Sequence, residues 1–116
     1  MELLQAIKER RTIRRFKPDP IPRELLEQLI QGAMWAPSAM NEQPWKFYVL
    51  TGSAKADLAN IAEGCIEKLD LRMQKLFNEK MRTMVRGYFK DFGGAPAVVV
   101  VVTKMPEERV YQRGSE

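Results

Sequence analysis

The fold is decided by the stretch Ala95-Pro96-Ala97-Val98-Val99-Val100-Val101-Val102-Thr103. Such a continuous run of β-branched residues predicts a central strand that is covered on both faces. Working outward, a second strand is predicted over residues 45–51, where aromatic and β-branched residues stop at Gly52. Two strands alone make only a marginal sheet. A central strand therefore implies further strands, supplied either by another chain or by the rest of a longer protein.

The first third of the chain carries two helical patterns. Leu3, Leu4 and Ile7 predict a short amphipathic helix that runs into a basic cluster. Pro22 suits the first turn of a second helix, because a missing N–H costs nothing there, and the apolar stripe of that helix runs from Leu25 to Met34.

The middle of the chain is predicted to be helical as well. Apolar residues keep a 3.6-residue period from Leu58 to Phe89, which is longer than most globular helices, so we expect a break near Gly64. Ser53 is the expected N-cap. On this stripe, Cys65 is predicted to be a small buried hydrophobic residue, and the methionines to serve core or dimer packing.

Composition places the chain among globular domains. Its 116 residues are 45% hydrophobic and 29% charged, and this length suits one domain of ordinary size. The net charge of +4 favours anionic ligands in general without choosing among them. Histidine is absent, which excludes His-based triads and imidazole metal sites.

Cysteine usage and hydropathy indicate a location in the cytoplasm. A single cysteine cannot form an internal disulfide, which fits a reducing compartment. The N-terminus lacks the apolar core of a signal peptide, and the longest apolar run is far shorter than a membrane span. We therefore expect no membrane association.

Two motifs carry functional signals. The first has four arginines and a hydroxyl within six positions and could converge on a phosphate, although a solvated basic face is the commoner meaning of such a run. The second is a proline-stiffened loop whose Ser, Asn and Gln could read the amide-like edge of a planar heterocycle, or could merely satisfy the local backbone. The motifs are Arg10-Arg11-Thr12-Ile13-Arg14-Arg15-Phe16 and Pro37-Ser38-Ala39-Met40-Asn41-Glu42-Gln43-Pro44-Trp45.

In this order and spacing, the two motifs resemble the N-terminal half of the FMN-dependent nitroreductase family. Gly94-Ala95-Pro96, before the valine-rich strand, is a third and looser match. The resemblance implies an α+β fold with a central, mainly antiparallel sheet flanked by helices, incomplete in this chain and expected to dimerise. Residues 1–116 would form a single domain that is the N-terminal part of a longer one.

The resemblance also assigns roles to individual residues. Arg10, Arg11 and Thr12 would hold the phosphate and ribityl side of FMN, and Arg14 would lie near the pyrimidine edge of the flavin. The other subunit of a homodimer would supply the remaining cofactor-binding residues. These are Pro37, Ser38, Ala39, Asn41 and Gln43. No residue is expected to act as a catalytic acid or base, because the cofactor carries the chemistry.

The predicted function is an FMN-dependent oxidoreductase that passes a hydride from NAD(P)H through flavin N5 to an electron-poor acceptor, such as a nitroaromatic or a quinone. The alternative is a non-enzymatic basic domain that binds nucleic acid or another polyanion through the arginine cluster. Asn41 and Gln43 favour the enzyme, since a polyanion binder has no use for them between two prolines. Interleaved aromatic residues for base stacking are also missing apart from Phe16.

Overall fold

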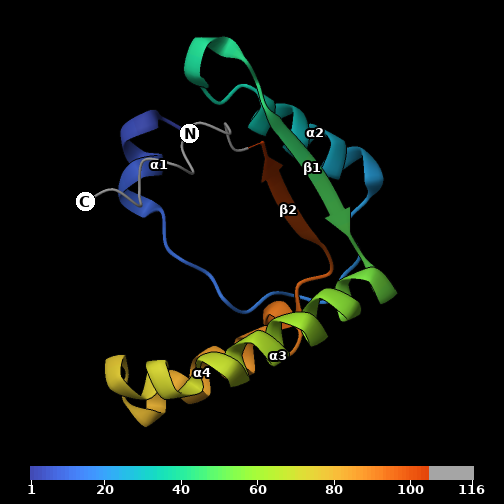
Figure 1. The fold of residues 1–116 in the computed structure, drawn as a ribbon. Coiled ribbons are helices and arrows are strands. Elements are labelled where there is room, and N and C mark those ends of the chain that lie inside the picture. The colour runs from blue at the N-terminus through green and yellow to red at the C-terminus, as the bar shows by residue number, and fades with distance from the viewer. Residues whose placement is uncertain (105–116) are drawn as a thin grey trace, which may run out of the picture. The chain divides into compact units, whose positions relative to one another are not determined.

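A computed structural model describes residues 1–104 of the chain. Four α-helices, two short 3₁₀ helices and two strands follow one another in the order α1, α2, η1, β1, α3, α4, η2 and β2 (Figure 1). Chain contacts divide them into two compact units. The first unit comprises Met1–Asp19 and Thr51–Pro96, and the second comprises Pro20–Leu50 and residues 97–104.

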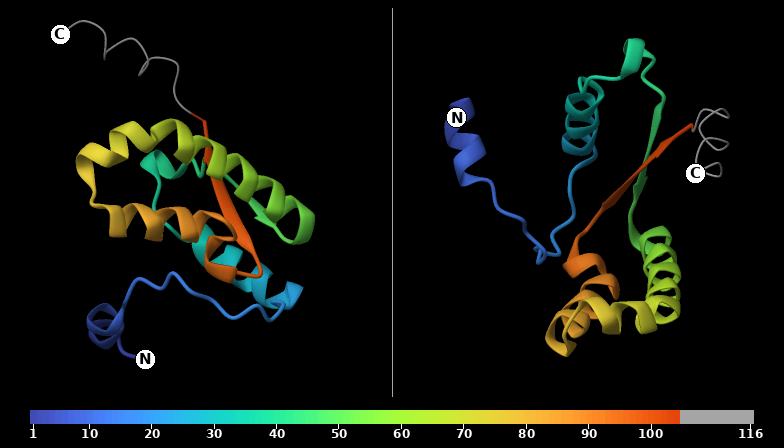
Figure 2. Two further views of the ribbon diagram at one scale, coloured as in Figure 1. Left: turned by 90° about the horizontal axis from the view of Figure 1, so that it is seen from below. Right: turned by 60° about the vertical axis from the view of Figure 1, so that its left-hand side comes forward.

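The first unit begins with α1 (Leu3–Glu9), the short helix that the apolar spacing predicts. An extended segment follows it, and the helical region of this unit contains α3 (Gly52–Leu76), α4 (Glu79–Phe89) and η2 (Phe92–Gly94). Helices α3 and α4 pack against each other (Figures 1 and 2). None of the helices within residues 1–104 is long and apolar enough to cross a membrane.

The expected break near Gly64 is wrong, because α3 continues through this residue to Leu76. The break lies instead at Phe77, which is extended, and Asn78 then caps α4 by accepting the Met81 backbone N–H at 2.9 Å. A glycine inside a helix costs only about 1 kcal/mol. An asparagine cap satisfies an otherwise unpaired N–H, so it marks the helix boundary more strongly than the glycine does.

The N-terminal boundaries of two helices also differ slightly from the predictions. Thr51 rather than Ser53 occupies the N-cap position of α3, because the chain turns as soon as the preceding strand ends. Pro22 occupies the N-cap position of α2 (Arg23–Met34), one residue before the predicted first turn, and its carbonyl accepts the N–H groups of Leu25 and Leu26.

The second unit contains α2 and an antiparallel pair of strands, β1 (Trp45–Leu50) and β2 (Val98–Thr103). The register pairs Trp45 with Thr103 and Leu50 with Val98, so both observed strands are paired over their whole length. Strand β2 begins three residues after the start of the predicted run 95–103, and β1 ends one residue before the predicted end at residue 51. The predicted loop over residues 36–44 is irregular apart from a single 3₁₀ turn, η1 (Ala39–Asn41).

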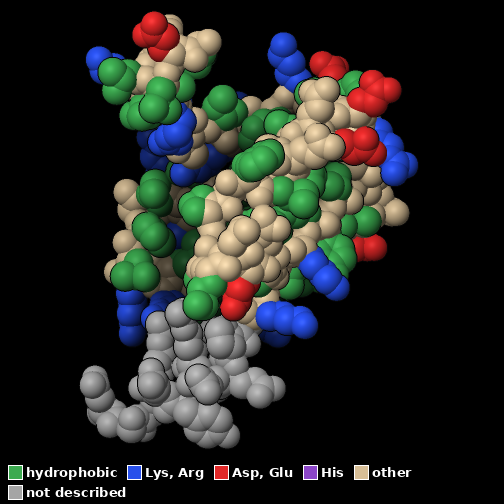
Figure 3. Space-filling view, turned by 90° about the horizontal axis from the view of Figure 1, so that it is seen from above, with side chains coloured by type: hydrophobic (Ala, Val, Ile, Leu, Met, Phe, Trp, Pro, Cys, Tyr) green, Lys and Arg blue, Asp and Glu red, His purple; other side chains and the backbone are tan. Residues whose placement is uncertain are grey.

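Within residues 1–104, β2 is not covered on both faces, as expected for a sheet that this chain leaves incomplete. Among residues 1–104 the sheet has only two strands, and Val101 remains 59% exposed. Val99 and Val102 of β2 and Tyr48 of β1 are exposed as well. Hydrophobic side chains are plainly visible on the molecular surface (Figure 3). The valine run has the composition of a covered strand, but covering it requires atoms that these residues do not provide.

Within residues 1–104 the buried residues are few, and all of them belong to the first unit. They are Ala59, Ile66, Phe92 and Ala95. The prediction that Cys65 is buried is wrong, since its side chain is exposed beside the buried Ile66. Adjacent residues of a helix point about 100° apart, so the one-position difference turns the thiol away from the core.

Candidate functional site

The arginine motif follows the end of α1 and forms an exposed, extended segment. Arg11 folds back onto this helix end, where one guanidinium nitrogen donates to the carbonyl oxygens of Lys8 and Arg10 at 2.9 Å each. Within residues 1–104, no carboxylate lies within ion-pair distance of Arg10, Arg11 or Arg14. Guanidinium groups without internal counter-ions are suited to bind an external anion, and Thr12 adds a hydroxyl to the same segment.

The end of the arginine motif is fastened to the turn η2. The Phe16 backbone N–H donates to the Gly93 carbonyl oxygen at 2.9 Å. Arg14 also borders a small cavity of about 170 Å³ on α4, beside Tyr88 and Phe89. The extended segment and the turn approach each other in Figures 1 and 2. The basic segment is therefore held at one end by its helix and at the other by a specific backbone contact.

The second motif forms a braced loop in the second unit. The Gln43 backbone N–H donates to the Ser38 hydroxyl oxygen at 3.0 Å, and the Gln43 side-chain amide donates to the Asn41 side-chain oxygen at 3.2 Å. Ser38 is half-buried, whereas Pro37, Ala39, Asn41 and Gln43 are exposed. The bonded pair leaves the Asn41 amide nitrogen and the Gln43 amide oxygen available to a ligand.

The backbone of this loop is strained. Met40 and Asn41 have φ of 54° and Gln43 has φ of 49°, in the left-handed region that residues other than glycine and asparagine rarely adopt. Each such residue costs on the order of 1 kcal/mol or more, and such strain concentrates at ligand sites. The Gln43–Ser38 and Gln43–Asn41 hydrogen bonds help to hold the unusual conformation.

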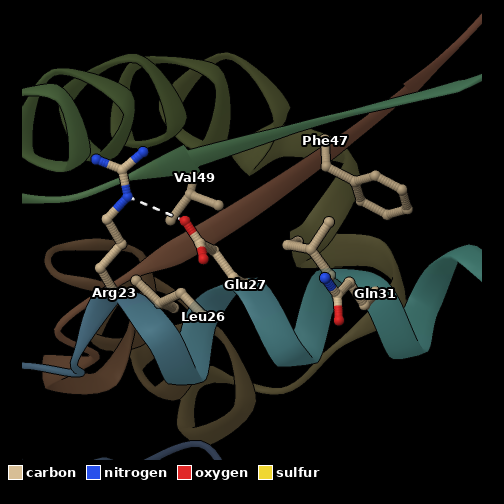
Figure 4. A pocket seen from close by; sticks show the side chains of 7 residues that line it. Arg23, Leu26, Glu27, Gln31, Phe47 and Val49 are labelled. Atoms are coloured by element: carbon tan, nitrogen blue, oxygen red, sulfur yellow. Dashed lines mark hydrogen bonds and ion pairs between the residues drawn. The ribbon is translucent and has the colours of Figure 1, made fainter.

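A groove of about 480 Å³ lies between α2 and β1, a feature that the sequence did not predict. Figure 4 shows Leu26 of α2 opposite Val49 and Phe47 of β1, with an ion pair between Arg23 and Glu27 at the rim. The groove lies where an apolar helix stripe faces an incompletely covered sheet. Its lining is mainly the apolar side chains of α2 and β1, and it contains no convergent set of catalytic groups within residues 1–104.

The structure thus keeps each motif together within one unit. Arg10, Arg11, Thr12 and Arg14 follow one another in the first unit, and the residues Pro37 to Gln43 form one loop in the second. Sequence reasoning missed the contact of Gly93 with the arginine segment. The Gly93-Gly94 pair itself was a signal, because two adjacent glycines permit a close backbone approach.

Comparison with known proteins identifies the class to which this chain belongs. A family model described as the nitroreductase family matches residues 7–116. The chain therefore belongs to the nitroreductase family, and the resemblance of its motifs is confirmed. The α+β fold is confirmed as well, because solved structures with this fold superpose on almost the whole chain.

Three relatives illustrate the range of similarity. A Bacillus subtilis protein with the provisional name NAD(P)H nitroreductase YfhC is 35% identical, over 90% of this chain and 51% of its own length. The iodotyrosine deiodinase of Haliscomenobacter hydrossis is 33% identical, over 89% of this chain and 48% of its own. The FMN-dependent nitroreductase NfnB of Mycobacterium smegmatis, solved in complex with NADPH, matches with a TM-score of 0.65 and 26% identity, over 92% of this chain and 62% of that one. The chain spans about half the length of such curated relatives.

Proposed function

We propose that this chain contributes the N-terminal part of a single-domain, homodimeric FMN oxidoreductase of the cytoplasm. NAD(P)H is the proposed hydride donor, and an electron-poor small molecule such as a nitroaromatic or a quinone is the proposed acceptor. Relatives named as nitroreductases and as a deiodinase support the redox class, and they differ in the acceptor that their names imply. The electron acceptor is therefore the least constrained part of the proposal.

One observation carries the proposal. Arg10, Arg11 and Arg14 are exposed on an extended segment, without a carboxylate within ion-pair distance among residues 1–104. The guanidinium groups of Arg10 and Arg11 and the Thr12 hydroxyl form a donor set that fits a phosphate monoester such as the one in FMN. Arg10, Arg11 and Thr12 would bind the phosphate and ribityl side.

The amide loop fits the other end of the same cofactor. Asn41 and Gln43 offer one donor and one acceptor, which is the pattern needed to read the pyrimidine edge of a flavin. Pro37, Ser38 and Ala39 would give this loop its shape, and the loop would act on the flavin of the partner subunit. Arg14 would add a positive charge that favours the reduced, anionic ring.

When bound, FMN supplies the hydride chemistry through its N5 atom. The residues of this chain bind and orient the cofactor, and no side chain is assigned a proton-transfer role. A homodimer is favoured by the exposed valines of β2 and by the exposed Met81 and Met84 of α4, since isolated monomers rarely leave so much apolar surface in water.

Flavin retention tests the proposal directly. The purified chain is mixed with FMN, passed through a desalting column and examined by ultraviolet–visible spectroscopy. Arg10→Ala should weaken FMN binding by about tenfold, because a charge-assisted hydrogen bond to phosphate contributes about 1.5–3 kcal/mol. Arg23→Ala removes the same charge from an exposed i,i+4 ion pair in the second unit and should leave retention unchanged.

Asn41→Gly tests the loop without adding strain, because glycine tolerates the positive φ of this position. It should also weaken retention, whereas Asn60→Gly would reveal any loss that comes from helix stability alone. If full-length protein that contains these residues retains no flavin, the proposal fails. Salt-sensitive binding to polyanions without any preference for flavin would instead support the basic interaction domain.

A further inference from the structure

We infer that Gly93 is a positioning residue for the arginine segment: the absence of its side chain lets η2 hold the backbone of Arg14 to Phe16, and this hold sets the path of the preceding residues Arg10 to Thr12, which would bind the phosphate. The inference deepens the proposed function and rests on it. It concerns residues of the first unit only, where both partners of the contact lie.

The contact leaves no room for a side chain. A Cβ atom added to Gly93 would lie 1.9 Å from the Arg14 carbonyl oxygen and 2.9 Å from its carbonyl carbon. Both atoms are backbone, so they cannot rotate away as a flexible side chain would. Any residue other than glycine at position 93 must therefore displace the chain at Arg14.

The same glycine also holds the segment by a hydrogen bond and by its own conformation. Its carbonyl oxygen accepts the Phe16 backbone N–H at 2.9 Å, and its φ of 70° is strained for any residue with a Cβ. Gly94, with φ of 79°, would place a Cβ 3.3 Å from the Phe16 carbonyl oxygen, a milder conflict. The two glycines together form a cradle for residues 14–16.

The turn that carries this cradle is one of the most firmly held parts of the molecule. Phe92 is buried and lies edge-on to Tyr88 and Phe89, at ring-centroid distances of 6.2 and 6.0 Å. Ala95 is buried too, and its carbonyl oxygen accepts from the Lys55 ammonium at 2.6 Å. A turn anchored on both sides can fix an otherwise exposed segment, which lowers the ordering cost of binding an anion.

Two measurements test the positioning role in the full chain. The first is the hydrogen-exchange rate of the Phe16 amide by nuclear magnetic resonance, which needs no flavin. The second is the ratio of the dissociation constants of riboflavin and FMN, from flavin fluorescence titrations. Because riboflavin lacks the phosphate, this ratio reports phosphate recognition, and a general loss of stability would weaken both ligands alike.

Gly93→Ala should increase the Phe16 exchange rate and lower the preference for FMN over riboflavin, each by about tenfold, which corresponds to one lost contact. Gly94→Ala should produce a smaller change in the same direction. Gly52→Ala is the matched control for strain, because Gly52 has φ of 55° but open space around its Cβ position. Gly87→Ala, also in open space, controls for substitution within the helical region.

The inference is overturned if Gly93→Ala keeps either the Phe16 protection or the FMN preference of the unmodified chain. It is also overturned if both Gly93→Ala and Gly94→Ala unfold by circular dichroism, since the glycines would then serve folding and not positioning. If full-length protein that contains these residues binds neither flavin, the proposed function is contradicted, while the Phe16 exchange rates still decide the backbone contact.

Discussion

The turn η2 and the strand β2 are neighbours in sequence but differ in how completely their side chains are buried. Phe92 and Ala95 are buried against α4 and their own turn, whereas the valines that begin three residues later are half-buried or exposed. A short turn can complete its packing with residues close in sequence. A strand needs a neighbour along each edge to pair all of its backbone groups, and covering its two faces takes separate layers of structure.

Phe92→Ala should have the largest effect, because it removes a buried ring from the aromatic cluster of the first unit. The expected loss is about 3 kcal/mol of unfolding free energy, from the lost transfer energy and the cavity left behind. Urea denaturation followed by circular dichroism measures it. Phe77→Ala is the matched control, since Phe77 is 43% exposed and should cost much less. Equal losses in the two variants would show that the turn is no better packed than the surface.

Val101→Lys tests the exposed face of β2, the less completely buried of the two regions compared. If the exposed face of β2 is an association surface, a lysine there should weaken self-association by at least about tenfold, because a charge would be buried at the interface. Sedimentation velocity over a range of concentrations measures this. Thr103→Lys adds the same charge at the end of the strand and should have little effect. Unchanged association in both variants would place the dimer interface elsewhere.

Asp70→Asn tests how much the ion pairs between α3 and α4 contribute to the stability of the first unit. Asp70 accepts from the Arg86 guanidinium and lies 3.9 Å from that of Arg82, and it is only partly exposed. Loss of the carboxylate charge should cost about 1 kcal/mol of unfolding free energy, measured by urea denaturation. Asp57→Asn, at an exposed position of α3, should cost almost nothing. A neutral result at Asp70 would mean that apolar packing alone joins the helices.

Gly64→Ala should have the smallest effect, and it should be stabilising. A Cβ at this position would have no neighbour within 4 Å, so the variant gains helix propensity of about 0.5–1 kcal/mol without a clash. Thermal unfolding by circular dichroism measures the gain. A destabilised variant would indicate that α3 does bend at Gly64, as the sequence alone suggested.

Local patterns were sufficient for the secondary structure. The amphipathic spacing of Leu3, Leu4 and Ile7 predicted α1, and the composition of residues 45–51 and 95–103 predicted both strands. The errors came where two local signals compete. Gly64 was given more weight than the capping residue Asn78, although a cap changes the hydrogen bonding of the backbone and a glycine only weakens it.

The candidate site divides in the same way. The arginines and the amide loop could be found in the sequence because both motifs are defined by residue types at fixed spacing. Other features could not be predicted from the sequence. The hydrogen bonds of Gln43 to Ser38 and Asn41 depend on backbone torsions, and the Gly93 contact joins segments about 80 residues apart.

Residue patterns were therefore enough to identify the family, most of the helices and strands, and the residue types of the proposed cofactor site. The three-dimensional fold was needed to show that α3 is continuous, that Cys65 faces outward, that the β2 valines lie exposed and that Gly93 contacts Arg14. The physical reason is that propensity and hydrogen-bonding type are properties of single residues and short windows. Burial and close approach are properties of pairs of surfaces, and they exist only once both surfaces are in place.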